Sequence, residues 1–214
     1  MKEPGLRRYA RPAAPTAHAA ADGPAERCEI CGTGLDARHG HLVALDDRAL
    51  RCACRSCWLL FTSPGAGDGR IRAVPERYLT DPAHRLTGDD WDRLQIPVMP
   101  AFFFFNSDLG RVIACYPSPA GAMESTLDLD GLEQLKRTYP LLRMPAPDVE
   151  AVYVCRPEAE LEAYLVPVDV CFGLAGAIRL RWRGQTGGAA VRQAMAEFAE
   201  DLRARSRPAP PDEA

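Results

Sequence analysis

The chain has 214 residues, with 26 lysines and arginines against 29 aspartates and glutamates and a formal net charge of −3. This acidic balance argues against a protein that holds nucleic acid through many phosphate contacts. The longest apolar run, residues 96–105, is about half as long as a membrane-spanning helix. The first residues also lack the apolar core of an export signal, so we expect a cytoplasmic protein with no membrane partner.

Composition divides the chain into segments. Residues 1–26 are rich in alanine and proline and predict a disordered tail, and residues 206–214 predict a second one. Between the tails we expect a small cysteine-rich finger over residues 27–63, a glycine-rich break, and a larger domain over residues 70–205.

The finger carries the strongest chemical signal. Five of the eight cysteines lie between residues 28 and 57, and in a reducing compartment such clusters are metal ligands more often than disulfides. Cys28 and Cys31 precede Gly32 as in a zinc knuckle, and Cys54 and Cys57 precede an apolar run typical of a first helical turn. This order predicts a treble-clef finger, or a zinc ribbon if the second pair also lies in a knuckle.

The first ligand set is therefore Cys28, Cys31, Cys54 and Cys57, because four cysteines supply the closed tetrahedral shell of a structural Zn²⁺ site. The segment has few large apolar side chains before Leu42. We therefore expect the metal to hold the segment folded rather than to act in catalysis.

The stretch between the two cysteine pairs predicts a β-hairpin. If residues 46–47 form its turn, His41 faces Cys52 across the hairpin. His39 then faces Cys54 on the same side, because strand residues alternate between faces. Cys52, His39 and His41 are therefore reserve ligands. The alternative role of Cys52 is a spare buried thiol, and that of the two histidines is a solvated hairpin end or a hydrogen bond to a thiolate. If all of them bind metal, they exceed what one Zn²⁺ needs, which favours an iron–sulfur cluster or a second metal.

The larger domain alternates strand-like and helix-like patterns. Strands are predicted over residues 98–105, 111–116, 151–155 and 161–168, the first two forming a hairpin. Helices are predicted from Thr87 to Leu94, Asp130 to Tyr139, Asp169 to Trp182 and Gly188 to Arg205, the second and third capped by their aspartates. Since the pattern lacks regular βαβ alternation, the predicted fold class is α+β, with a mostly antiparallel sheet and packed helices. Cys115, Cys155 and Cys171 lie in apolar surroundings and are predicted to be buried.

Other chemistry is weaker. Arg181, Arg183, Gly187 and Gly188 precede or open the last helix and form a weak candidate for anion binding. The favoured alternative is a helix connector with solvated arginines. No histidine follows His84, so a Ser-His-Asp triad in the larger domain would need a histidine from elsewhere. No catalytic residue is assigned, and an enzyme is the less favoured class.

Five motifs stand in one order along residues 27–205: Cys28-x2-Cys31-Gly, His39-x-His41-Leu, Cys52-Ala-Cys-Arg-x-Cys57-x-Leu-Leu-Phe, Tyr116-Pro-Ser-Pro-Ala-Gly121 and Trp182-Arg-Gly-x-x-Gly-Gly188. Together they resemble an uncharacterised, mainly actinobacterial family, a domain of unknown function often encoded beside uptake NiFe-hydrogenase genes. The resemblance implies an accessory or assembly role, with a hydrogenase subunit or accessory protein as partner.

Taken together, these features predict a non-enzymatic, metal-stabilised accessory protein that binds a protein partner. One alternative is an iron–sulfur redox or electron-transfer protein that uses the same cysteines. A second is a zinc-finger nucleic-acid binder with Arg48, Arg51 and Arg55 along one edge, which the acidic net charge disfavours.

Overall fold

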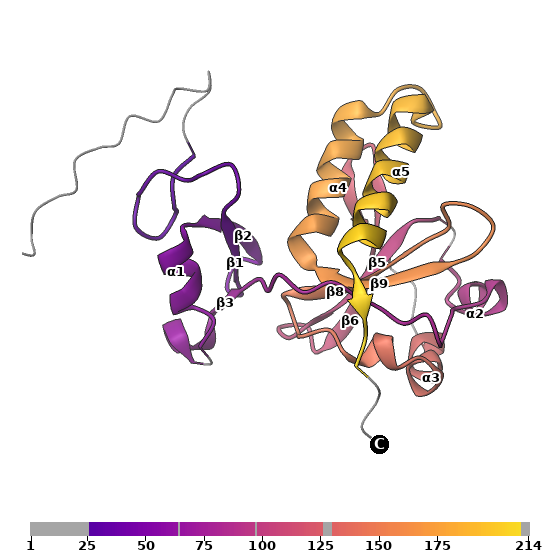
Figure 1. Cartoon of the computed structure of the whole chain (residues 1–214), viewed down its shortest axis with the longest axis horizontal. Helices are drawn as coiled ribbons and strands as arrows, with labels where there is room; N and C mark the ends of the chain where they lie inside the picture. Colours follow the sequence, from indigo (N-terminus) through magenta and orange to yellow (C-terminus); the bar gives the residue numbers. More distant parts are fainter. Residues whose placement is uncertain (1–25, 64, 97, 126–129, 211–214) are drawn as a thin grey trace, which may run out of the picture.

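The computed structural model describes residues 26–63, 65–96, 98–125 and 130–210. Its elements form two parts, a small cysteine-rich unit over residues 26–74 and a larger domain that follows it (Figure 1). The tail predicted over residues 1–26 lies outside the described residues except for Glu26.

The cysteine-rich unit is a three-stranded antiparallel sheet with one short helix. Its elements are β1 (Gly40–Ala44), β2 (Ala49–Ala53), α1 (Arg55–Leu60), a 3-10 turn (Ala66–Gly69) and β3 (Ile71–Ala73), and the strand order is β2-β1-β3. Because β3 returns across the glycine-rich segment to pair with β1, the unit extends past the boundary predicted at residue 63.

The core of this unit is small. Its fully buried apolar residues are Cys28, Leu42 and Ala53, and Trp58 packs against them. The Trp58 indole donates to the carbonyl of Val74 at 2.8 Å, which ties α1 to the end of the unit. A β-carbon on Gly40 would lie 2.5 Å from the Trp58 ring, so only glycine lets the indole lie this close to β1.

The larger domain contains a seven-stranded sheet. Its strands are β4 (Leu79–Thr80), β5 (Ala101–Asn106), β6 (Arg111–Ser118), β7 (Gly121–Glu124), β8 (Glu150–Cys155), β9 (Glu162–Pro167) and β10 (Arg207–Pro208), in the order β10-β4-β9-β8-β5-β6-β7. Strand β10 runs parallel to β4, and the other neighbouring strands of this sheet are antiparallel. The fold therefore contains both helices and sheets, as the predicted class requires. Its large sheet is not purely antiparallel, because it includes the parallel pair of β10 and β4.

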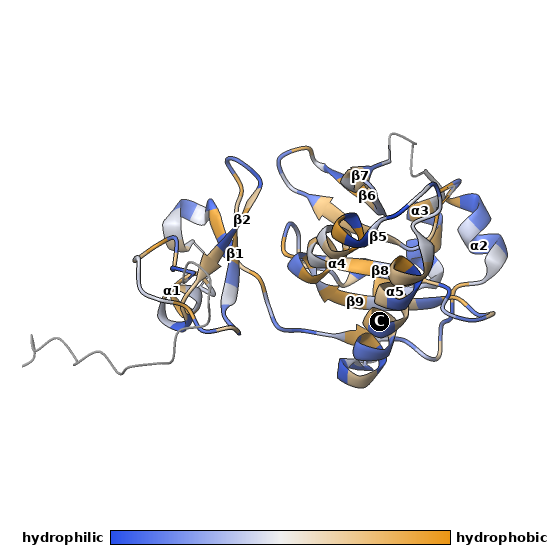
Figure 2. Ribbon diagram, turned by 90° about the horizontal axis from the view of Figure 1, so that it is seen from above, coloured by the Kyte–Doolittle hydropathy of each residue, from blue (hydrophilic) through white to orange (hydrophobic). Residues whose placement is uncertain are grey.

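Helices cover both faces of the large sheet. They are α2 (Gly88–Arg93), α3 (Asp130–Thr138), α4 (Val168–Arg181) and α5 (Gly188–Arg205), with a 3-10 turn at Pro140–Arg143. Neighbouring residues of β5 point to opposite faces: Phe102 belongs to the core under α4 and α5, and Phe103 to the core with α2 and α3. Apolar residues accordingly dominate central strands such as β8 (Figure 2).

The predicted elements of the larger domain are present with shifted ends. Strand β5 begins at Ala101 rather than at residue 98, after Pro100, which has no N–H for the ladder. Asp169 was expected to cap α4, but the helix begins at Val168, and Asp169 lies in its first turn. Its carboxylate contacts His41 instead, at 2.7 Å. Helix α3 begins at Asp130, so its capping position lies outside the described residues.

The C-terminal segment differs from the predicted disordered tail. Residues 206–210 continue along the sheet edge, where the N–H of Arg207 donates to Tyr78 at 3.1 Å and that of Ala209 to Thr80 at 2.8 Å. The Arg205 guanidinium lies 3.8 Å from the centre of the Tyr78 ring. The backbone groups of the short strand β4 thus give this proline-rich segment a fixed place, which its composition does not reveal.

Candidate metal centre

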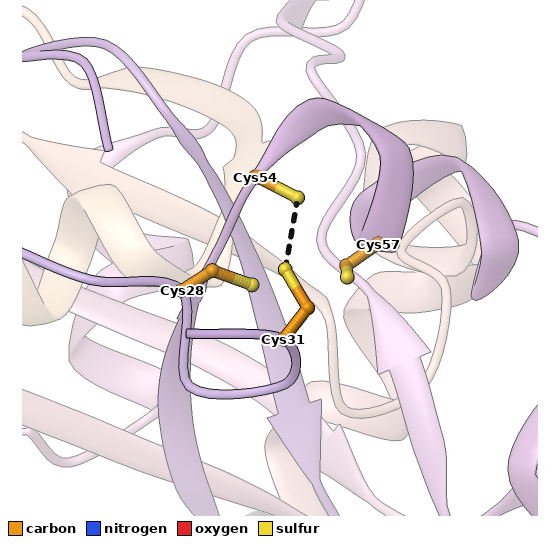
Figure 3. Close-up of side chains that lie close together, drawn as sticks. All are labelled: Cys28, Cys31, Cys54 and Cys57. Atoms are coloured by element: carbon orange, nitrogen blue, oxygen red, sulfur yellow. Dashed lines mark hydrogen bonds between the residues drawn. The ribbon is translucent and has the colours of Figure 1, made fainter. Parts of the chain in front are cut away.

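The four cysteines of the first ligand set come from two segments that meet at one place. Cys28 and Cys31 lie in the turn before β1. In this turn Gly32 has a φ of 74°, and its N–H donates to the backbone carbonyl of Cys28 at 2.8 Å. Cys54 is the N-cap residue of α1, and Cys57 lies in the first turn of that helix. Figure 3 shows the four side chains gathered around one space.

The sulfur positions match a small coordination shell. The four Sγ atoms all lie within 4.8 Å of one another. The Sγ atoms of Cys31 and Cys54, which are 23 positions apart in sequence, are 3.7 Å apart. A Zn²⁺ ion with Zn–S bonds of about 2.3 Å holds its sulfurs about 3.8 Å apart. Cys28, Cys31, Cys54 and Cys57 are therefore a group that can hold one metal ion.

The surroundings of the cluster shift the pKa values of two of its thiols in opposite directions. Burial raises the pKa of Cys28, but hydrogen bonds from the backbone N–H groups of Cys54 and Cys31 outweigh burial and bring this pKa to about 6. Burial and the neighbouring thiols raise the pKa of Cys57 to about 12. Without a cation, Cys28 therefore favours the thiolate and Cys57 the thiol, and a bound metal ion supplies the positive charge that favours a thiolate at Cys57 as well.

The reserve ligands form a second group. The hairpin has the predicted register, with His41 opposite Cys52 and Val43 opposite Leu50. One nitrogen of His39, one nitrogen of His41 and Sγ of Cys52 lie within 4.8 Å of one another. Cys54, which the register also places opposite His39, belongs to the four-cysteine group, as the first ligand set predicts. The predicted surplus of ligands is thus divided between two clusters of four and three side chains.

The hairpin also contacts the larger domain. His41 Nδ1 lies 2.7 Å from Oδ2 of Asp169 at the start of α4, and this carboxylate raises the pKa of the imidazole. Arg72 Nη1 lies 2.9 Å from Oδ2 of Asp148. Sequence reasoning gave neither aspartate a role in the site, because no local pattern reports a partner 128 residues away.

A cavity of about 300 Å³ lies between the hairpin and the larger domain. Its wall is mostly apolar, with Leu45 and Leu50 from the hairpin, Phe104 and Ile113 from the sheet, and Phe172 from α4. This cavity separates part of the hairpin from β5 and β6, while the contacts of His41 and Arg72 hold the two parts together.

The weak anion candidates lie in the connection between α4 and α5. Arg181 donates to the carbonyl of Ala177 at 3.3 Å, and Arg183 donates to the carbonyl of Trp182 at 2.8 Å. Gly187 and Gly188 have φ angles of 82° and 77°. Both guanidinium groups therefore donate hydrogen bonds to backbone carbonyls at the end of α4, which favours the helix-connector interpretation.

The other three cysteines are buried as predicted. Cys115, Cys155 and Cys171 belong to the core cluster of the larger domain. Burial raises the pKa of Cys115 and of Cys155 to about 12. These thiols behave as small apolar side chains and are not members of either metal-binding group.

Comparison with known proteins gives a family but no activity. Within the part of the chain that the structure describes, no helix has the length and apolar character needed to cross a membrane. No curated protein and no solved structure matches the chain. The sequence model of one family matches residues 27–206, which include both groups of candidate ligands. The chain therefore belongs to DUF5947, a family of unknown function.

Proposed function

We propose that Cys28, Cys31, Cys54 and Cys57 hold a structural Zn²⁺ ion, and that the protein is a non-enzymatic accessory protein whose finger binds a protein partner. The distance of 3.7 Å between the sulfurs of Cys31 and Cys54 carries the proposal. A knuckle, a hairpin and a helix that carries the second cysteine pair are the parts of a treble-clef finger. Four thiolates also close the shell, which leaves no open position for catalysis.

The closeness of all four sulfurs, which lie within 4.8 Å of one another, favours a single ion over an iron–sulfur cluster. A cluster places several iron and sulfide atoms between its cysteine ligands, so the ligand sulfurs lie further apart than they do around one ion. We expect protein purified without oxygen and without an affinity tag to be colourless and to retain one Zn²⁺ after extensive dialysis. Elemental analysis and a visible spectrum test this. Brown protein with bound iron and sulfide would instead support the redox alternative.

A protein partner is favoured by the surface of the finger. Ile30 in the knuckle is 40% exposed, and Leu59 and Leu60 on α1 are 49% and 60% exposed. Large apolar side chains grouped on one small unit are typical of an interaction site. Two of the three arginines of the nucleic-acid alternative are engaged: Arg51 pairs with Glu29 and Asp47, and Arg55 lies over the Trp58 ring.

We propose that the partner belongs to the hydrogenase assembly, which rests on the resemblance described above. A purified hydrogenase subunit or accessory protein should bind the zinc-loaded protein in a titration. The double variant Leu59→Glu/Leu60→Glu is expected to weaken this binding at least about tenfold, because charges replace apolar contacts.

Leu180→Glu is the matched control, since Leu180 is 77% exposed but lies on α4 of the larger domain. Unchanged binding by this variant is expected. Equal loss of binding in both variants, or binding to none of the purified hydrogenase proteins, would contradict the proposed interaction.

A further inference from the structure

We propose that His39, His41 and Cys52 form a second metal site, distinct from the four-cysteine site, that takes an exchangeable first-row divalent ion such as Zn²⁺. The site is assembled by the hairpin itself: His39 precedes β1, His41 lies on β1, and Cys52 is its direct partner on β2. One potential ligand atom from each of the three residues lies within 4.8 Å of the others. The inference does not depend on which ion the four cysteines hold.

The orientation of the two imidazole rings is the first argument. Nδ1 of His39 lies 3.0 Å from the carbonyl oxygen of Asp36, and Nδ1 of His41 lies 2.7 Å from Oδ2 of Asp169. A carbonyl and a carboxylate only accept hydrogen bonds, so Nδ1 carries the hydrogen in each neutral ring. The lone pair then lies on Nε2 of both histidines. Metal-binding histidines in proteins are held in this way by a carbonyl or carboxylate behind the ring.

A buried nitrogen without a partner is the second argument. The His39 side chain is only 10% exposed, and its Nε2 is buried with no hydrogen-bond partner among the described residues. Buried polar atoms nearly always have a hydrogen-bond partner or a bound metal ion, so the unpartnered Nε2 of His39 indicates a missing ligand. A metal ion shared with His41 and Cys52 satisfies it. The His41 side chain is 32% exposed, which leaves the ion a path from solvent.

The donor set decides the class of ion. Two imidazoles and one thiolate are ligands for zinc and neighbouring transition metals, whereas magnesium and calcium prefer oxygen. Tetrahedral zinc holds its nitrogen and sulfur ligands about 3.3–3.8 Å apart, so ligand atoms that lie within 4.8 Å of one another need to approach by no more than about 1.5 Å on binding. Three protein ligands leave the fourth position to water or to a ligand from another molecule. This open position separates the second site from the closed four-cysteine site.

The second site also lies where the two parts of the protein meet. Asp169 belongs to α4, so the ion would be held by the cysteine-rich unit and oriented by the larger domain. Val43 and Leu50, which pair across the same hairpin, pack against the core of the larger domain. Metal binding at His41 therefore acts on the contact between the two parts.

The test is a metal titration of the tag-free, full-length protein that already holds its first equivalent of Zn²⁺. Added Zn²⁺ is followed by calorimetry, and Co²⁺ by its visible absorbance. Wild type should bind one further equivalent. His41→Ala and Cys52→Ser should lose that equivalent and retain the first, whose retention shows that the unit is folded. Asp169→Asn should weaken the second site by about 10–100-fold.

His84→Ala is the matched control, because His84 Nδ1 lies 2.9 Å from Oδ2 of Asp81 in a similar histidine–aspartate pair with neither Cys52 nor a second histidine beside it. This variant should bind the second equivalent as wild type does. The proposal is overturned if wild type binds no second equivalent. It is also overturned if the His41 and Cys52 variants still bind that equivalent, or if they lose the first equivalent, since the residues would then belong to one shared site.

Discussion

Replacing Cys57 with serine is expected to release the metal ion from the four-cysteine site and to unfold residues 26–74. A serine hydroxyl is a poor replacement for a thiolate ligand, and three sulfurs do not close a structural shell. Bound zinc contributes roughly 10–16 kcal/mol to the folding of isolated fingers. The apolar core of this unit, with only Cys28, Leu42 and Ala53 fully buried, is too small to replace that contribution.

Elemental analysis and amide hydrogen exchange measure the effect of Cys57→Ser. The bound zinc should fall below stoichiometry, and amides of β1, β2 and α1 should lose protection while those of β8 and β9 keep it. Cys171→Ala is the control, because Cys171 is fully buried in the larger domain and belongs to neither candidate site. Stoichiometric zinc and protected β1 amides in Cys57→Ser would show that this ligand set is wrong.

Replacing Arg77 with alanine is expected to destabilise the larger domain by about 3 kcal/mol. The Glu150 side chain is fully buried, and Arg77 binds both of its oxygens, Nε to Oε1 at 2.8 Å and Nη2 to Oε2 at 2.5 Å. Without Arg77, the hydrogen bond that remains to the carboxylate from the described residues is that of the Ala146 N–H, 2.8 Å from Oε2. The guanidinium side chain is 42% exposed, so water replaces part of the lost interaction, which keeps the effect at the lower end of that for buried pairs.

Urea unfolding of the zinc-loaded protein, followed by circular dichroism, measures the change in the free energy of unfolding. Arg85→Ala serves as control, because Arg85 and Glu160 are 63% and 74% exposed and their pair should contribute less than about 1 kcal/mol. The double variant Arg77→Met/Glu150→Leu should recover much of the loss, since it removes the buried charge as well. Equal stability of Arg77→Ala and wild type would contradict this account.

Sequence patterns predicted the parts of the fold that depend on interactions between residues close together in the chain. The register that places His41 opposite Cys52 follows from a tight turn and from strand alternation, and both act within a dozen residues. Thr87 forms the expected cap of α2: its hydroxyl oxygen accepts from the N–H of Asp90, and its own N–H donates to the Asp90 carboxylate. The grouping of the four cysteines follows from the spacing of two C-x2-C pairs around a hairpin.

Long-range pairing decides what the sequence did not reveal. Strands β3, β4 and β10 have only two or three residues each, too few for a periodic pattern. Strands β3 and β4 pair with the longer strands β1 and β9, and β10 pairs in turn with β4. The partner of His41 is equally hidden, since an aspartate at the start of an apolar helix predicts a cap. The hairpin register alone would also place Cys54 beside His39, but Cys54 caps α1 and lies with the other three cysteines, as its spacing from Cys57 predicts.

The C-terminal strand has a consequence for how the molecules behave at high concentration. The outer edge of a sheet is a template on which a strand of another molecule can add, and β10 occupies the edge beside β4. Pro208 within β10 has no N–H, and Pro210 lies two residues further on. The outermost backbone of the sheet therefore offers few hydrogen-bond donors to a strand of another molecule. Removal of the chain from residue 206 onward would expose the edge of β4 and favour edge-to-edge aggregation, even though residues 206–210 belong to neither candidate metal site.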